Sequence, residues 1–335
     1  RGLGDVYKRQ TTDFIQSIIM SVALIVVLIF GVETAGGIGA VIHNASELPG
    51  YLSMTLSYDV NTGKAAPYSA LTIVSTAAWG LGYFGMPHIL LRFMAIEDEK
   101  KLKLSRRVAT IWVVISLFVA VFIGVIGYTM SKVGALEMLT GSNSETIIVK
   151  ISALLSQHGV IFALLAGVIL AGILASTMST SDSQLLAASS AVSSDILGAF
   201  RKDSSNKNGS MAAARITLLV ISVVAAFIAR NPDSSVFAIV SFAWAGFGAA
   251  FGPVVLFSLF WKRTNKWGAL AGMVCGGSMV FIWKYLIRPL GGIWNIYELL
   301  PAFLIACAAI VIVSLLTPKP SKEIEEEFDR VAQMK

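Results

Sequence analysis

The stretch Trp79-Gly-Leu-Gly-Tyr-Phe-Gly-Met-Pro-His88 lies in the middle of an apolar segment that runs from about Ala70 to Ala95. An apolar segment of this length can cross a bilayer as a helix. Its centre, however, carries three glycines, which weaken a helix, and then Pro87, which lacks a backbone N–H and clashes with the carbonyl four residues earlier. The stretch therefore predicts a broken helix at membrane depth.

A break at this depth has a functional meaning, because freed backbone groups in a bilayer must face protein or a water-filled cavity. Secondary transporters build ion and substrate sites at such breaks. Trp79, Tyr83 and Phe84 flank the break and are placed to wall a site of this kind. The alternative is a helix kinked at Pro87 whose glycines serve close packing, since both residue types are common in membrane helices. The density of glycine and proline favours the binding site.

The composition excludes a soluble globular domain. Of 335 residues, 56% are hydrophobic and 14% are charged, and the mean hydropathy is +0.75. These values indicate an all-α polytopic membrane protein in contact with the lipid bilayer. The net charge of +6 does not predict nucleic-acid binding, because the basic residues gather in short loops between apolar spans. The sequence has no Walker motif, no His/Glu metal box and no Ser/His/Asp set, so it supports neither an enzyme, nor an ATP-driven pump, nor a bound cofactor.

Hydropathy predicts about eight membrane spans. They cover residues 14–34, 68–95, 108–131, 159–182, 211–230, 235–261, 267–287 and 297–316. A polar loop with turn residues Asp59, Asn61 and Gly63 is expected near 35–66, and a short amphipathic helix near 146–157. Residues 1–10 are polar and unpatterned and are interpreted as a non-native leader. Residues 11–317 then form the transmembrane domain, and 318–335 a charged tail that is either a solvated helix or disordered.

Loop charge predicts the orientation of the chain. Basic residues concentrate at 100–107, at 201–207, at 262–266 and at 319–322, whereas the intervening loops hold fewer. Positive loops remain in the cytoplasm, so we expect a protein of the cell membrane whose C-terminus is cytoplasmic.

A second polar stretch, Ser176-Thr-Met-Ser-Thr-Ser-Asp-Ser183, ends the fourth predicted span. Ser179 and Thr180 offer two hydroxyl oxygens, and Ser176 lies on the face of Ser179 and offers a backbone carbonyl if the helix loosens there. Hard cations prefer such oxygen ligands. The alternative is that the hydroxyls bond back to carbonyls in the preceding turn or hold neighbouring helices together.

Asp182 strengthens the case for an ion site, because an ionisable residue near membrane depth is costly and usually functional. It shares the face of Ser179 and is a candidate for the path of an ion. A solvated position just inside the cytoplasmic boundary fits Asp182 equally well. In the sixth span, Ala243, Gly246 and Ala250 recur at helical spacing and predict close packing of a neighbouring helix, as do Gly272, Gly276 and Gly277 in the seventh.

Three stretches together resemble the sodium/solute symporter family, and most closely its proline-transporting branch. They are Trp79–Ala95 (WGLGYFGMPHILLRFMA), Leu174–Leu186 (LASTMSTSDSQLL) and Ser241–Phe257 (SFAWAGFGAAFGPVVLF). Thr12-Asp13 at the start of the first span also fits. The resemblance extends over nearly all of the chain after residue 10.

The resemblance implies the inverted-repeat fold of leucine-type amino-acid transporters and uptake of L-proline with sodium by alternating access. Matched by motif, Trp79, Tyr83 and Pro87 are similar to substrate-side residues. Ser179 and Thr180 are similar to sodium ligands, and Ser176 to a backbone-carbonyl ligand. Met86 stands where the best-known members have Gln, which leaves the substrate open, and Asp182 replaces a small or neutral residue of some members.

The family places about five further helices before Thr12, including the other broken helix of the inverted pair. The chain is therefore expected to be the C-terminal part of a longer transporter and to hold half of each site. Another small solute, such as a different amino acid, a carboxylate or a vitamin, is the nearest alternative substrate. A channel or a membrane-embedded sensor on the same fold is the alternative of a different class.

Overall fold

The computed structural model describes residues 3–60, 62–94, 96, 98, 100–196, 207–231 and 234–333. Nearly all of the regular structure is helical, which confirms the predicted all-α class. The chain divides into two compact units. Unit 1 comprises Arg1–Ser53, Ser57–Ala65 and Arg92–Ser235, and unit 2 comprises Met54–Leu56, Ala66–Leu91 and Val236–Lys335.

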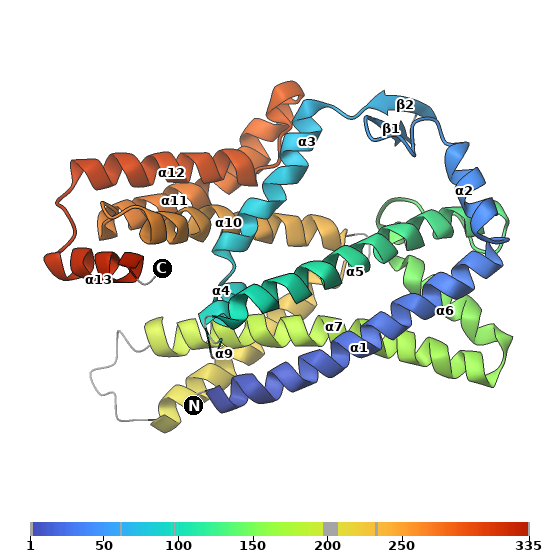
Figure 1. The fold of residues 1–335 in the computed structure, drawn as a ribbon, viewed down its shortest axis with the longest axis horizontal. Coiled ribbons are helices and arrows are strands. Elements are labelled where there is room, and N and C mark those ends of the chain that lie inside the picture. The colour runs from blue at the N-terminus through green and yellow to red at the C-terminus, as the bar shows by residue number, and fades with distance from the viewer. Residues whose placement is uncertain are drawn as a thin grey trace. The chain divides into compact units, whose positions relative to one another are not determined.

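Unit 1 is a bundle in which α1 and α7 lie side by side (Figure 1). Its helices are α1 (Leu3–Thr34), α2 (Ile38–Ser46), α5 (Lys101–Lys132), α6 (Ile147–Leu155), α7 (Val160–Ser190) and α9 (Lys207–Ile228). Shorter pieces are the 3₁₀ segments Gly141–Thr146 and Ser156–His158 and a π-helical turn, Ala191–Ile196. Gly172 on α7 faces α1, where an added Cβ would make an ordinary van der Waals contact, 3.5 Å from the Cβ of Ala23. The core is aliphatic and includes Val27, Ile126, Ile151 and Ile169, each at most 1% exposed.

Unit 2 is built on three long helices that pack against one another. They are α10 (Val236–Phe260), α11 (Lys266–Ile282) and α12 (Leu299–Leu316). The connection from α11 to α12 contains a π-helical turn, Trp283–Ile287, and two 3₁₀ turns, Arg288–Leu290 and Gly292–Trp294. Gly272 and Gly276 allow the close approach of neighbouring helices that was predicted for them. A Cβ added to Gly272 would lie 2.4 Å from Ile310 on α12, and one added to Gly276 would lie 2.2 Å from the carbonyl oxygen of Ala249 on α10. A Cβ on Gly277 would come no closer than 3.9 Å to Ala250.

The predicted second span is interrupted as the sequence indicates. It consists of α3 (Ala70–Ala77), a 3₁₀ segment η1 (Ala78–Gly85) and α4 (Pro87–Met94). Before it, the predicted polar loop contains α2 and a small hairpin of β1 (Leu56–Asp59) and β2 (Lys64–Pro67), which the all-α prediction did not include. Gly63 adopts a positive φ of 67° in the hairpin turn, whereas Asn61 lies outside the described residues.

Six helices of the described chain are long and apolar enough to span a membrane. They correspond to the first, third, fourth, sixth, seventh and eighth predicted spans, and only 11–33% of each apolar window is buried within the chain. Apolar surface of this extent requires lipid or other helices to cover it. The second predicted span is the interrupted segment, and the fifth has a shorter apolar part, Ala212–Ile228. Six of the eight predicted spans therefore correspond to uninterrupted helices, and the membrane crossing of the second and fifth stays a prediction.

Both ends of the described chain are helical. Helix α1 begins at Leu3, so residues 3–10 continue into the first span, and the interpretation of 1–10 as a leader stays a prediction. The charged tail forms α13 (Lys322–Gln333), one of the two states expected for it. Lys262, in the turn after α10, places its Nζ 2.6 Å from the Asp329 carboxylate on α13, and this contact links the tail to the rest of unit 2.

Candidate functional site

The break in the second span begins with regular helix and ends at Met86. Ser69 caps α3 by accepting a hydrogen bond of 3.2 Å from the N–H of Thr72. The chain tightens to 3₁₀ geometry from Ala78 and becomes extended at Met86, with φ −83° and ψ 110°. Proline disfavours helical geometry in the residue before it and is well suited to the first position of a helix. Pro87 therefore ends one helical half and starts the next, α4.

Glycines in the break allow α10 to approach its backbone. A Cβ on Gly82 would lie 1.9 Å from the indole nitrogen of Trp244, and one on Gly85 would lie 2.3 Å from the carbonyl oxygen of Phe247. On α10, a Cβ on Gly248 would lie 2.7 Å from the Cα of Gly82. Helices approach this closely only where small residues face each other. The glycines of the break thus serve packing on α10 as well as backbone freedom.

The small residues of α10 that are buried within this chain are not those singled out from the sequence, and packing of another helix on Ala243, Gly246 and Ala250 stays a prediction. Ala243 is exposed, and a Cβ on Gly246 would have nothing within 4 Å. The buried small residues of α10 are instead Ala245, Gly248, Ala249 and Gly252, followed by Pro253. Two stripes of small residues run along this helix, and Gly82 and Gly85 select the second because only that stripe lets the two backbones meet.

Trp79 lies at the centre of a cluster of aromatic rings. Its ring stacks on Phe237 at 5.6 Å, on Trp244 at 5.5 Å and on Tyr297 at 5.9 Å between centroids. The indole nitrogen of Trp244 also donates a hydrogen bond of 2.9 Å to the backbone carbonyl of Trp79. Trp79 was predicted from the sequence but its three ring partners were not, although Trp244 lies within the family-like stretch Ser241–Phe257.

Tyr83 and Pro87 follow Trp79 along the break and are both exposed. The Tyr83 ring meets the Trp244 ring edge-on, with centroids 4.8 Å apart at an interplanar angle of 83°, and Tyr83 is 51% exposed. A phenol held by its ring edge, with its other surface open, can offer both an aromatic face and a hydroxyl to a bound solute. Tyr83 therefore has the features that a substrate-side residue needs.

The three sodium-ligand candidates on α7 gather around one backbone oxygen. The Ser179 hydroxyl donates to the carbonyl oxygen of Ser176 at 3.2 Å, and the Thr180 hydroxyl donates to the same oxygen at 3.4 Å. Helix α7 is regular through this region, so the expected loosening at Ser176 is not present. The observed pattern is the back-bonding that sequence analysis gave as the alternative.

Back-bonding does not remove the capacity of these hydroxyls to hold a cation. Each hydroxyl uses its proton toward Ser176 and keeps its oxygen lone pairs. A monovalent cation at this turn would meet the two hydroxyl oxygens of Ser179 and Thr180, and the protons can rotate away from the carbonyl. This turn supplies only part of a coordination shell, so further oxygens from other segments are needed. Asp182 is exposed on the next turn, and its role in an ion path stays a prediction.

The two candidate sets belong to different units. Trp79, Tyr83 and Pro87 lie in unit 2, whereas Ser176, Ser179 and Thr180 lie in unit 1. In unit 2, Trp79 and Tyr83 both contact Trp244, and in unit 1 the Ser179 and Thr180 hydroxyls both reach the Ser176 carbonyl. That the two sets border one cavity stays a prediction.

Several curated proteins are similar in sequence to this chain over most of its length. It is 37% identical to the osmoregulated proline transporter OpuE of Bacillus subtilis over 311 residues, which are 93% of this chain and 59% of the relative. It is 36% identical to the sodium/proline symporter of Escherichia coli over 95% of this chain and 60% of the relative. With the sodium/proline symporter of Haemophilus influenzae it shares 41% identity over 78% of this chain and 51% of the relative.

The chain thus spans about 51–60% of the length of these relatives. The family model of the sodium:solute symporter family matches residues 4–276, which include the break, the hydroxyl turn on α7 and the whole of α10. A match of this extent identifies the chain as a member of the sodium:solute symporter family.

Proposed function

We propose that the chain is the C-terminal part of a secondary transporter that imports L-proline together with sodium. The observation that carries the proposal is the interrupted span Ala70–Met94, with an aromatic cluster at its break, in a family member whose relatives are named as proline transporters. A broken helix with an aromatic wall is the arrangement from which secondary transporters build a substrate site. Trp79, Tyr83 and Pro87 are the proposed substrate-side residues.

Sodium is the proposed driving ion, held in part by the hydroxyl oxygens of Ser179 and Thr180; the Ser176 carbonyl joins them only if α7 loosens at that turn. One charge that crosses 100 mV releases about 2.3 kcal/mol, which is enough to concentrate a neutral zwitterion without ATP. Coupling requires that sodium and proline each raise the affinity for the other. Asp182, one turn beyond the hydroxyls, is proposed to lie on the ion path. The proposal needs no cofactor and no catalytic step, so it assigns transport rather than an enzymatic activity.

The remaining oxygens and part of the substrate pocket are assigned to helices outside this chain. Half of a coordination shell binds a monovalent cation weakly, because sodium must exchange its hydration shell for enough protein oxygens. The chain alone is therefore expected to insert in the membrane without transporting. The proposed location is the cell membrane, with the C-terminus in the cytoplasm as the basic loops indicate.

Labelled L-proline uptake into proteoliposomes tests this function. A full-length transporter that contains this chain is expected to accumulate proline only under an inward sodium gradient, and the chain alone is expected to show no uptake. Unlabelled proline should compete fully, whereas other amino acids, carboxylates and vitamins should compete weakly. Equal competition by one of those solutes would move the substrate to that class, and uptake without sodium would contradict the coupling.

A further inference from the structure

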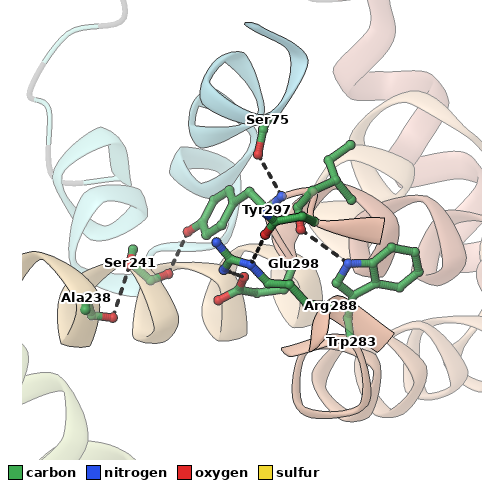
Figure 2. A network of polar contacts seen from close by, with 9 residues as sticks. Ser75, Ala238, Ser241, Trp283, Arg288, Tyr297 and Glu298 are labelled. Atoms are coloured by element: carbon green, nitrogen blue, oxygen red, sulfur yellow. Dashed lines mark hydrogen bonds and ion pairs between the residues drawn. The ribbon is translucent and has the colours of Figure 1, made fainter. Parts of the chain in front are cut away.

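The connection between α11 and α12 holds a polar network in which every member has a partner, and Figure 2 shows it. Glu298 is 1% exposed, and its carboxylate lies 2.8 Å from Nη1 of Arg288. The Nε atom of Arg288 donates to the side-chain oxygen of Asn295 at 3.0 Å. A buried carboxylate persists only if it is paired and hydrogen-bonded. The network therefore fixes the backbone of the connection immediately before α12.

Residues on both sides of Tyr297 are anchored. On its C-terminal side is Glu298, held by Arg288. On its N-terminal side, the carbonyl oxygen of Ile296 accepts a hydrogen bond of 3.3 Å from the indole nitrogen of Trp283, a residue that is 9% exposed. Tyr297 thus projects from a stretch of backbone that has little freedom to move.

Tyr297 itself connects this stretch with two other elements. Its backbone N–H donates to the hydroxyl oxygen of Ser75 on α3 at 2.7 Å, and its own hydroxyl donates to the carbonyl oxygen of Ser241 on α10 at 2.6 Å (Figure 2). Its ring stacks on Trp79 with centroids 5.9 Å apart and an interplanar angle of 16°.

Ser75 and Trp79 lie on either side of the point where α3 becomes 3₁₀. A residue that contacts both Ser75 and Trp79 therefore stabilises the backbone geometry at the N-terminal side of the break. The side chain of Trp79 then has its position set by Tyr297, Trp244 and Phe237 together, and only Tyr297 of these three comes from the α11–α12 connection.

We propose that Tyr297 is a positioning residue of the transporter, which fixes Trp79 and the end of α3 from the rigid α11–α12 connection. The inference rests on the proposed function where it concerns substrate affinity, because it takes Trp79 as a substrate-side residue. Its structural part, that loss of Tyr297 releases the break, is independent of the substrate.

The first test measures proline uptake by the full-length transporter. Tyr297→Leu removes the ring stack and the hydroxyl and is expected to raise KM for proline roughly tenfold, since a stacked aromatic pair contributes about that factor to an equilibrium. The maximal rate per folded molecule should change little. Tyr297→Phe keeps the ring and should restore KM to within about threefold of the parent. Tyr285→Leu is the control, because the Tyr285 ring contacts Phe242 rather than Trp79.

The second test needs no substrate. Cys275 and Cys307 are free thiols and are replaced by alanine, and Ala78→Cys then places one reporter thiol at a position that is 4% exposed at the start of the break. Tyr297→Leu is expected to raise the alkylation rate of this thiol severalfold in detergent-solubilised protein. Ser75→Ala, a mild change that removes the acceptor of the Tyr297 N–H, should raise it less, and Tyr285→Leu should leave it unchanged.

The two tests separate the possible failures. If the parent protein takes up no proline but Tyr297→Leu accelerates alkylation, the proposed function fails and the positioning role stands. If alkylation and the KM for proline are both unchanged in folded Tyr297→Leu, or if Tyr297→Phe behaves like Tyr297→Leu, the positioning role is overturned while sodium-coupled uptake by the parent stands.

Discussion

The indole N–H of Trp244 donates a 2.9 Å hydrogen bond to the backbone carbonyl of Trp79, and the rings of the two residues stack with centroids 5.5 Å apart. This carbonyl lies in the 3₁₀ part of the break, where backbone hydrogen bonds have poorer geometry than in an α-helix. At membrane depth such a carbonyl needs a protein partner. Helix α10 therefore supplies both an aromatic ring that packs on Trp79 and the hydrogen-bond donor that satisfies its carbonyl inside the membrane.

Because α10 lies close to the break, substitution of different glycines in the break is predicted to change the stability of the protein by very different amounts. Gly82→Ala would place a methyl group 1.9 Å from the Trp244 indole, and Gly80→Ala would meet nothing within 4 Å. We expect Gly82→Ala to destabilise the protein by about 1–3 kcal/mol through overpacking and to abolish transport. Gly80→Ala should change stability by less than about 1 kcal/mol. Thermal unfolding in detergent measures both, and equal melting temperatures would contradict the observed packing.

Substitution of two neighbouring exposed aromatic residues of the break tests whether the Tyr83 hydroxyl contacts the substrate. Tyr83 is 51% exposed and Phe84 is 42% exposed, and only Tyr83 carries a hydroxyl. Tyr83→Ala is expected to raise KM for proline about tenfold, which corresponds to roughly 1.4 kcal/mol of binding free energy. Phe84→Ala, which removes a ring but no hydroxyl, should raise KM less than Tyr83→Ala does. An unaltered KM in Tyr83→Ala would remove Tyr83 from the pocket.

The buried ion pair Arg288–Glu298 makes a prediction about stability. Arg288→Ala leaves the Glu298 carboxylate, which is 2% exposed, without its charged partner. Removing one member of a buried pair costs up to about 3–5 kcal/mol, and because Arg288 is 41% exposed we expect a value below that range. Adding Glu298→Gln should recover part of the loss. Arg330→Ala, which breaks a pair exposed on both sides, is the control, and a melting temperature equally unchanged in both single variants would refute the role of the pair.

The pair Glu137–Lys150 predicts a pH dependence in unit 1. A hydrogen bond from Lys150, together with its positive charge, lowers the pKa of the Glu137 carboxyl. A lowered pKa in the folded state contributes stability above the unfolded pKa of about 4.3, and this contribution disappears as pH falls through the folded value. Glu137→Gln should therefore reduce the loss of thermal stability between neutral pH and about pH 4. Identical pH profiles for the variant and the parent would show that the pair has no such effect; both side chains are largely exposed, so the effect should be small.

Local sequence was sufficient to predict the break in the second span. The three glycines and Pro87 weaken helical geometry in the segment that contains them, so no distant contact is needed to predict the break. The extended geometry at Met86 follows from the proline after it. The long apolar helices were predictable for a similar reason, because hydropathy depends on composition within one segment. The hydroxyl turn was singled out from its own residues, and the resemblance gave it a sodium role. In the structure Ser179 and Thr180 bond back to one oxygen, the Ser176 carbonyl, which was the expected alternative.

The partners of the break were not predictable from local pattern. Trp244 and Tyr297 reach Trp79 across 165 and 218 positions of the chain, and no spacing rule relates them. The face of α10 that meets the break could not be chosen from the sequence, because Ala243-Gly246-Ala250 and Ala245-Gly248-Gly252 are both small stripes at helical spacing. Only the glycines on the other side of the contact decide between them.

The most direct test of the account is the sodium dependence of proline uptake in Thr180→Ala. In the full-length transporter this change removes one proposed sodium ligand, and Thr177→Ala is the matched control, because Thr177 bonds back to the Ile173 carbonyl and lies outside the proposed ligand set. We predict that Thr180→Ala raises the sodium concentration for half-maximal uptake at least about tenfold, with unchanged expression, while Thr177→Ala leaves it unaltered. Unchanged sodium dependence in Thr180→Ala would contradict the assignment of sodium to this turn of α7.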